Sequence, residues 1–138
     1  MYIKGSFSDH VGLLHREMDV NVLRRNVIAN NISNSETPNF KRSFINYESE
    51  LQRALNAQNK YRLSAHTTDK RHIQFAALKD PKDVMPRQVL DYLTTSKNNG
   101  NNVNVEHEMI SAMENQMLYQ TLVQSISAEF SRVNIVLR

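Results

Sequence analysis

The last third of this chain contains a long apolar repeat that limits the folds open to it. From Val105 onward, alternate steps of four and three residues reach ten positions, of which only Gln116 is polar, whereas a hydrophobic content of 40% would supply about four apolar ones. Such spacing predicts one α-helix over 104–138 that packs lengthwise against other helices. The nine apolar positions, called the C-terminal seam, are Val105, Met109, Ala112, Tyr119, Val123, Ile126, Phe130, Val133 and Leu137.

More apolar residues lie beside this seam than one neighbouring helix would cover, which predicts several neighbours. Asn104 precedes the repeat and is expected to cap the helix, with Glu106 and Glu108 in the first turn, where carboxylates oppose the positive helix end. The flanking apolar residues are Ile110, Met113, Met117, Leu118 and Leu122.

The first third repeats the pattern less regularly, because Asn21 and Arg25 interrupt it. We expect a helix from Ser8 to about Ser33, with Ser8 or Asp9 as its cap. Two long amphipathic helices at the ends of one chain favour an antiparallel, coiled-coil-like pair in a mainly all-α fold. The N-terminal seam consists of Val11, Leu14, Met18, Ile28 and Ile32.

A chain of 138 residues is long enough for one modest core, so a single unit is expected. Its predicted segments are a helix over 1–34, a turn and arm over 35–57, a polar and partly irregular insertion over 58–103, and the second helix over 104–138. Residues 44–57 fit either a short helix or an extended arm, and residues 72–78 fit a short β-strand. Asn99-Gly100 is typical of a tight turn.

Positive charge gathers in the middle of the chain, where residues 41–97 hold eleven basic and six acidic residues. A nucleic-acid-binding surface is one interpretation. The acidic residues interspersed there and the lack of a recognisable nucleic-acid-binding motif favour a solvated surface or an acidic partner instead. The basic residues concerned are Lys41, Arg42, Arg53, Lys60, Arg62, Lys70, Arg71, Lys79 and Lys82.

Catalytic, metal and cofactor sites are not expected. The chain has no cysteine, and glycines only at positions 5, 12 and 100 exclude the glycine-rich nucleotide-binding motifs. His10 and His15 are five residues apart and do not share a helical face as residues four apart would, and the three polar side chains over 106–108 are expected to be solvated. An enzyme built on a helical bundle is only a nominal alternative. No apolar run is long enough for a membrane span or a cleaved signal peptide, so export would need another route.

The stretch ANNISNSETPNFKR, over 29–42, is a strong helix stop. Asparagine and serine side chains hydrogen-bond to nearby backbone groups, Thr37-Pro38 favours an extended turn, and Asn39 tolerates a left-handed conformation. These residues predict a sharp reversal that returns the chain along the helix it has just left.

This stretch resembles the A-N-x-x-N/S-x-x-T-P/x-G-F/Y-K/R signature of the flagellar rod and hook axial proteins. Asn39 stands where that family usually has glycine, and asparagine is a common substitute at a positive φ. The matching residues are Ala29, Asn30, Asn31, Ile32, Asn34, Thr37, Pro38, Phe40, Lys41 and Arg42.

Two further segments resemble the same family. NNGNNVNVEHEM, over 98–109, is similar to the D-G-N-x-V stretch that opens the family's C-terminal helix, with Asn99 in place of aspartate. TTDKRHIQF, over 67–75, is similar to a Thr-x-x-x-His-Ile element of the short rod subunits, and the length of the chain favours the proximal rod subunits over longer relatives.

The resemblance implies a structural subunit of the bacterial flagellar basal-body rod, a helical drive shaft for motility that spans the periplasm. It implies partners among copies of the chain, other rod and basal-body proteins and the flagellar type III export apparatus, which uses no cleaved signal. Nucleic acid, membrane insertion, cofactors and catalysis are not part of this expectation.

Overall fold

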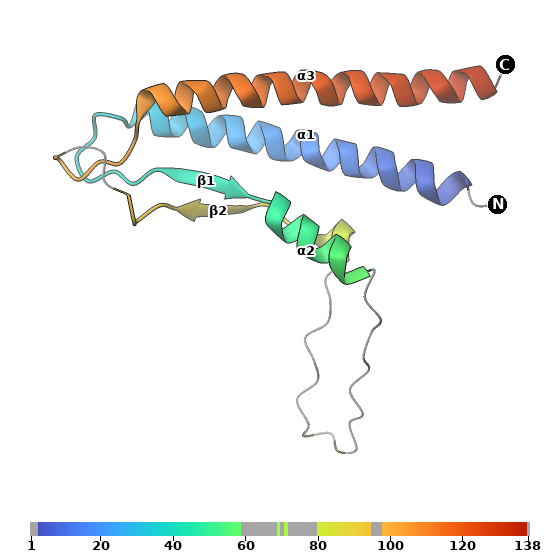
Figure 1. The fold of residues 1–138 in the computed structure, drawn as a ribbon, viewed down its shortest axis with the longest axis horizontal. Coiled ribbons are helices and arrows are strands. Elements are labelled where there is room, and N and C mark those ends of the chain that lie inside the picture. Colours follow the sequence, from blue (N-terminus) through green and yellow to red (C-terminus); the bar gives the residue numbers. More distant parts are fainter. Residues whose placement is uncertain (1–2, 59–68, 70, 72–79, 95–97, 138) are drawn as a thin grey trace. The chain divides into compact units, whose positions relative to one another are not determined.

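The computed structural model describes residues 3–58, 69, 71, 80–94 and 98–137 (Figure 1). The described chain divides into two compact units, the first made of Met1–Ile45 with Gln88–Arg138 and the second of Asn46–Arg87. The expected strand over 72–78 lies outside the described residues. The elements, in chain order, are α1 (Ile3–Ser33), β1 (Ser43–Asn46), α2 (Glu48–Gln58), η1 (Pro81–Asp83), β2 (Arg87–Leu90) and α3 (Val105–Val136).

In the first unit, α1 and α3 lie side by side and antiparallel (Figure 1). Near one end of the pair, the rings of Phe7 and Phe130 meet edge-on with centroids 6.4 Å apart. Further along, Nδ2 of Asn115 donates to the carbonyl oxygen of Asn21 at 3.0 Å. Residue numbers therefore rise along α1 as they fall along α3. The predicted mainly helical fold with a long antiparallel pair is confirmed.

The predicted start of the first helix is wrong. α1 begins at Ile3, so Ser8 and Asp9 lie inside it and neither is the cap. No proline stands between these positions, and a helix interior tolerates Gly5 at a modest cost, so nothing local stops the helix at Ser8.

The predicted start of the second helix is confirmed. Asn104 has an extended backbone, and its Oδ1 accepts hydrogen bonds from the backbone N–H groups of Glu106, at 3.0 Å, and His107, at 3.2 Å. These bonds satisfy two donors that have no partner within the first turn of a helix.

The middle of the chain contains both structures that residues 44–57 were expected to choose between. β1 is extended and pairs with β2 in a two-stranded antiparallel sheet, and α2 follows. Within the second unit, Tyr47, Ala54 and Val84 are buried. Asp80 caps η1 by accepting from the backbone N–H of Lys82 at 3.0 Å.

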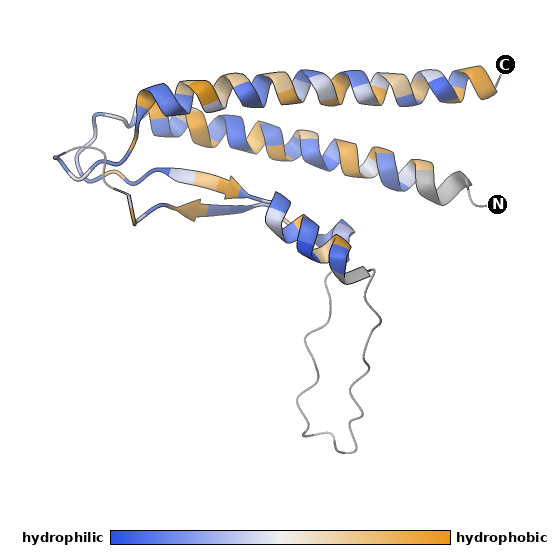
Figure 2. Ribbon diagram, in the orientation of Figure 1, coloured by the Kyte–Doolittle hydropathy of each residue, from blue (hydrophilic) through white to orange (hydrophobic). Residues whose placement is uncertain are grey.

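The buried face of α3 is set by residues seven positions apart, Glu108, Asn115 and Leu122. The buried residues of α1 are likewise mixed, namely Val20, Asn21, Ile28 and Asn31. A spacing of seven keeps a residue on one face of a helix that packs lengthwise against another. Figure 2 shows hydrophobic and hydrophilic residues alternating along the whole length of α3. The two helices therefore share a thin core with a substantial polar content.

Truncation of Leu122 tests this description of the core. Leu122 is 8% exposed and Leu118, one turn before it, is 40% exposed. We expect Leu122→Ala to lower the free energy of unfolding by about 2–4 kcal/mol, because it removes buried methyl groups and leaves a cavity, and Leu118→Ala to lower it by less than about 1 kcal/mol. Urea denaturation followed by circular dichroism measures both, and equal losses would show that α1 and α3 pack on a different face.

Candidate functional site

The segment after α1 turns on its own hydrogen bonds. The backbone N–H of Asn34 donates to the carbonyl oxygen of Asn30, that of Ser35 to Ile32 and that of Thr37 to Asn34, each at 3.1 Å. Nδ2 of Asn34 also donates to Oδ1 of Asn30 at 2.6 Å. Side-chain amides of this kind compete with helical bonding and stop the helix, as the sequence predicts.

Two residues with left-handed backbones meet where the reversal contacts the segment before α3. Asn39 has φ of 58° and Gly100 has φ of 79°. The backbone N–H of Asn39 donates to the carbonyl oxygen of Asn99 at 3.0 Å. A Cβ atom on Gly100 would lie 2.6 Å from Oδ1 of Asn39. The left-handed conformation expected of Asn39 is confirmed, and Gly100 has both a conformational and a steric reason to be glycine.

Asn101 is buried and holds this contact together. Its Nδ2 donates to the carbonyl oxygens of Asn34, at 2.9 Å, and Thr37, at 2.8 Å, while its Oδ1 accepts from the backbone N–H of Val103 at 2.7 Å. Nζ of Lys41 donates to the carbonyl oxygen of Gly100 at 2.7 Å. The reversal and the entry to α3 therefore form one hydrogen-bonded structure.

The carboxylate of Glu108 is the centre of this region. Its side chain is 1% exposed, and its Oε1 accepts from Nε of Arg42 at 2.8 Å. Its Oε2 accepts from Nδ2 of Asn31 at 3.1 Å. The expectation that Glu108 is solvated is wrong, because two donors from the reversal stretch replace the water that a buried carboxylate loses.

Asn31 also anchors the returning chain. Its Nδ2 donates to the carbonyl oxygen of Ser43 at 2.8 Å, and its Oδ1 accepts from the backbone N–H of Ser43 at 3.1 Å. This pair of bonds has the pattern that a neighbouring strand would supply. The predicted return of the chain toward α1 is therefore held by one buried carboxamide.

Asn102 connects the arm to the segment after β2. Its Oδ1 accepts from the backbone N–H of Arg42 at 2.6 Å, and its Nδ2 donates to the carbonyl oxygen of Asp91 at 2.7 Å.

The Thr94 hydroxyl donates to Asp91 Oδ2 at 2.7 Å. Together with the backbone N–H groups of Thr94 and Leu93, this bond lowers the pKa of the Asp91 carboxyl. Sequence reasoning missed the roles of Asn101 and Asn102, although clustered asparagines are a known signal for side-chain bonds to backbone.

The remaining positions of the reversal stretch are more open. Ala29, Asn30, Thr37 and Pro38 are exposed, whereas Ile32 and Phe40 are half-buried. Of the basic residues in the middle of the chain, Lys41 and Arg42 bond within this network, and Arg53 pairs with Glu50 at 3.0 Å. The functional assignment of the stretch as a whole stays a prediction.

The structure divides the C-terminal seam between two environments. Four of its residues are half-buried, namely Val105, Ala112, Ile126 and Val133, and five are exposed, namely Met109, Tyr119, Val123, Phe130 and Leu137. In the N-terminal seam, Ile28 is buried and Val11, Leu14, Met18 and Ile32 are half-buried. Leu122, which lies beside the predicted seam, is buried instead. The assignment of both seams to neighbouring subunits stays a prediction.

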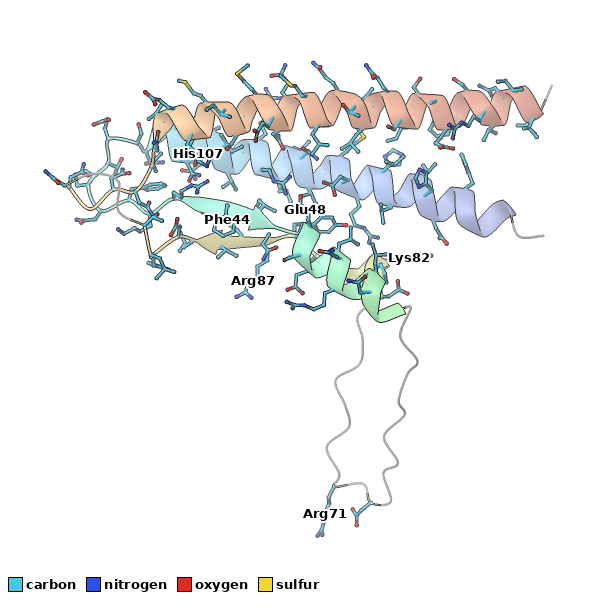
Figure 3. The ribbon with its side chains drawn as sticks, viewed as in Figure 1. Phe44, Glu48, Arg71, Lys82, Arg87 and His107 are labelled. Atoms are coloured by element: carbon cyan, nitrogen blue, oxygen red, sulfur yellow. The ribbon has the colours of Figure 1, made fainter. Side chains whose placement is uncertain are left out.

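The side of α3 opposite its buried face carries a methionine stripe, defined as Met109, Met113 and Met117. Met113 and Met117 are 61% and 60% exposed, and Ile110 beside them is also exposed. Figure 3 shows sulfur-bearing side chains projecting from α3 away from α1. A flexible thioether side chain adapts to irregular surfaces, so such a stripe suits contact with other chains.

Together, these hydrogen bonds hold the end of α1, the returning arm and the start of α3 in fixed positions. Among the residues described, no three His, Asp or Glu side chains gather as a metal site would require. In the same part of the chain, no helix combines the length and the apolar character needed to cross a membrane. The network fixes backbone geometry through bonds that the chain makes with itself.

Residues 23–41 match the family model described as flagella basal body rod protein. That span covers the end of α1 and the reversal. The chain is 41% identical over 133 residues to the flagellar basal body rod protein FlgB of Borreliella burgdorferi, covering 96% of this chain and 98% of the relative. The chain belongs to the FlgB family of flagellar basal body rod proteins. It is also 40% identical to FlgB of Borrelia hermsii, over 96% of this chain and 98% of the relative, and 31% identical to FlgB of Bacillus subtilis, over 95% of each.

Removal of the Glu108 side chain tests the network of this FlgB-family protein. Because Glu108→Ala removes the buried carboxylate that pairs with Arg42 and leaves Nδ2 of Asn31 with only the Ser43 carbonyl oxygen as acceptor, we expect it to lower the free energy of unfolding by about 3 kcal/mol. Glu106 is an exposed carboxylate in the same helical turn, and Glu106→Ala should cost less than about 1 kcal/mol. Chemical denaturation compares them, and a similar small loss for both would contradict a central role for Glu108.

Gly100 and Gly12 give a second matched pair of substitutions. Gly100→Ala places a Cβ atom against Asn39 and holds alanine at positive φ, so we expect a loss of about 1–2 kcal/mol or more. Gly12 lies within α1, and a Cβ atom there meets nothing within 4 Å among the described residues, so Gly12→Ala should stabilise by up to about 1 kcal/mol. Thermal unfolding distinguishes these outcomes, and stabilisation by Gly100→Ala would refute the described turn.

Proposed function

We propose that this chain is a structural subunit of the flagellar basal-body rod, which joins copies of itself and other rod proteins through the apolar surface that the α1–α3 pair leaves open. The observation that carries the proposal is the exposed methionine stripe, together with the exposed residues of the C-terminal seam. Fully burying one such side chain contributes roughly 1.5–3 kcal/mol, so a few at one contact are enough to favour association.

The polar interior of the helix pair supports the same function. Glu108, Asn115, Asn21 and Asn31 are buried on the facing sides of the two helices, whereas methionines are exposed on the outer side of α3. A helix hairpin that functions as a monomer would bury most of its apolar residues between its helices. The burial of these polar groups beside Val20, Ile28 and Leu122, together with the exposed methionines, favours a subunit whose outer faces are covered after assembly.

Identical contacts repeated from one subunit to the next build a helical tube when the rotation between subunits does not close into a ring. We infer that the chain contributes to the drive shaft in this way, at the proximal rod, in the part that spans the periplasm. The flagellar type III apparatus is the export route that this location requires. The names of the relatives and their nearly complete coverage of the chain support the assignment to the basal-body rod.

The nucleic-acid alternative has less support. Two residues of the basic middle, Lys41 and Arg42, bond to the entry of α3, which removes them from a free cationic surface. The related proteins are named as flagellar basal body rod proteins, and a structural role agrees with the hydrogen-bond network around Glu108. No catalytic step is therefore proposed.

Charge introduced into the methionine stripe tests the proposal. We expect Met113→Asp combined with Met117→Asp to abolish motility and rod incorporation, because two carboxylates would have to lose water at the contact, while the isolated chain keeps its helical content. Complementation of a strain lacking its own copy of this subunit, followed by detection of the chain in purified basal bodies, measures the effect.

Leucine at the same two positions is the matched control, because it keeps the stripe apolar and similar in volume, and it should retain motility. Circular dichroism of both purified variants separates assembly from folding. Normal motility of the aspartate variant would rule out the methionine stripe as an assembly surface.

A further inference from the structure

Asn99 and Gly100 form the one Asn-Gly pair of the sequence, since the other two glycines follow Lys4 and Val11. An asparagine followed by glycine is prone to lose its side-chain amide, because the backbone nitrogen of the glycine attacks that amide and no Cβ atom obstructs the approach. Asparagine counts among the thermolabile residues of proteins. The sequence therefore offers one position where this reaction is most favourable.

The structure places the side-chain amide of Asn99 close to the nitrogen of Gly100. Oδ1 of Asn99 accepts from the backbone N–H of Asn101 at 3.1 Å. A side chain that bonds to the backbone two residues ahead folds over the peptide group that follows its own Cα atom, and that group contains the nitrogen of Gly100. Asn99 is also exposed, so water and hydroxide reach the amide.

The same hydrogen bond assists the reaction. Attack on Cγ of Asn99 moves negative charge onto Oδ1, and the N–H of Asn101 already donates to that oxygen. A donor held at the oxygen where charge develops lowers the barrier to attack on a carbonyl carbon. Asn101 is buried and donates to the carbonyl oxygens of Asn34 and Thr37, which keeps its backbone in place.

We propose that Asn99 is a deamidation site of the folded chain, at which the backbone nitrogen of Gly100 displaces ammonia. This nitrogen loses its proton to hydroxide and forms a bond to Cγ of Asn99. The bond from Cγ to Nδ2 breaks, Nδ2 takes a proton from water and leaves as ammonia, and a cyclic succinimide remains. One water molecule then opens the ring, so the net reaction is hydrolysis of an amide to a carboxylic acid and ammonia.

The two products of ring opening act differently on the turn. Cleavage between Cγ and the Gly100 nitrogen gives aspartate, whose carboxylate still accepts from Asn101 and adds negative charge to the turn that Lys41 contacts. Cleavage at the backbone carbon gives isoaspartate, which lengthens the main chain by one carbon atom. The added carbon displaces Gly100 where even a Cβ atom would lie 2.6 Å from Oδ1 of Asn39. Aspartate therefore preserves the contact between the reversal and the entry to α3, and isoaspartate weakens it.

Peptide mass spectrometry of the folded, full-length chain tests the site. Incubation at mildly alkaline pH in water enriched in heavy oxygen labels each asparagine that reacts before digestion. Asn34, which precedes Ser35, is the internal control, because it is half-buried and its Nδ2 donates to the carbonyl oxygen of Asn30 at 2.9 Å. We expect Asn99 to react at least roughly tenfold faster than Asn34, a difference of about 1.4 kcal/mol in barrier. Equal rates would overturn the proposal, as would an intact Asn99 in the folded chain under conditions where it reacts in urea.

Two variants complete the test. Asn99→Gln keeps the carboxamide but would have to close a larger ring, so we expect no label at this position, and labelling at the wild-type rate would overturn the proposed attack by Gly100. Asn99→Asp should keep the wild-type melting temperature, whereas aged chain enriched in isoaspartate should melt several degrees lower. Equal melting of these two samples would contradict the assignment of their effects. All these measurements concern the single chain, so their failure leaves the proposed rod function unaffected.

Discussion

The buried carboxylate of Glu108 determines how the end of α1, the returning arm and the start of α3 are arranged. A carboxylate removed from water must have donors, and here they come from Arg42 in the returning arm and Asn31 near the end of α1. The start of α3 is therefore held at one point to two segments that lie 66 and 77 positions earlier in the sequence. Because Glu108 lies in the first turn of α3, this point also aligns the start of α3 with the end of α1 and sets the antiparallel pairing of the two helices.

The helix pair buries several polar side chains and exposes several apolar ones. Carboxamides and a carboxylate are buried between the helices, and methionines are exposed on the outer side of α3. Bonds between polar groups depend on direction and position, so they define how the pair fits together, whereas apolar contacts depend mainly on area. This FlgB-family chain thus keeps its directional bonds inside, while the methionine side chains of α3 stay exposed.

Local signals were sufficient where a residue acts on its own backbone. The Asn104 cap, the left-handed Asn39 and the turn at Asn99-Gly100 follow from the backbone preferences of the residues themselves, and the sequence predicted each of them. The start of α1 was missed because no local residue stops the helix at Ser8. Glu108 was misjudged because its partners lie 66 and 77 positions away, beyond the reach of helical periodicity.

Periodicity, capping and turn chemistry are short-range, so the amino-acid sequence alone predicted the two long helices and the reversal between them, whereas the link to a rod family came from the resemblance of the motif over 29–42. Only the tertiary structure decided which face of α3 meets α1. Apolar spacing indicated the C-terminal seam, yet Glu108, Asn115 and Leu122 form the buried face. The physical reason is that a helix with apolar residues on several sides can pack on more than one of them, and the choice depends on long-range bonds to Glu108 and Asn115.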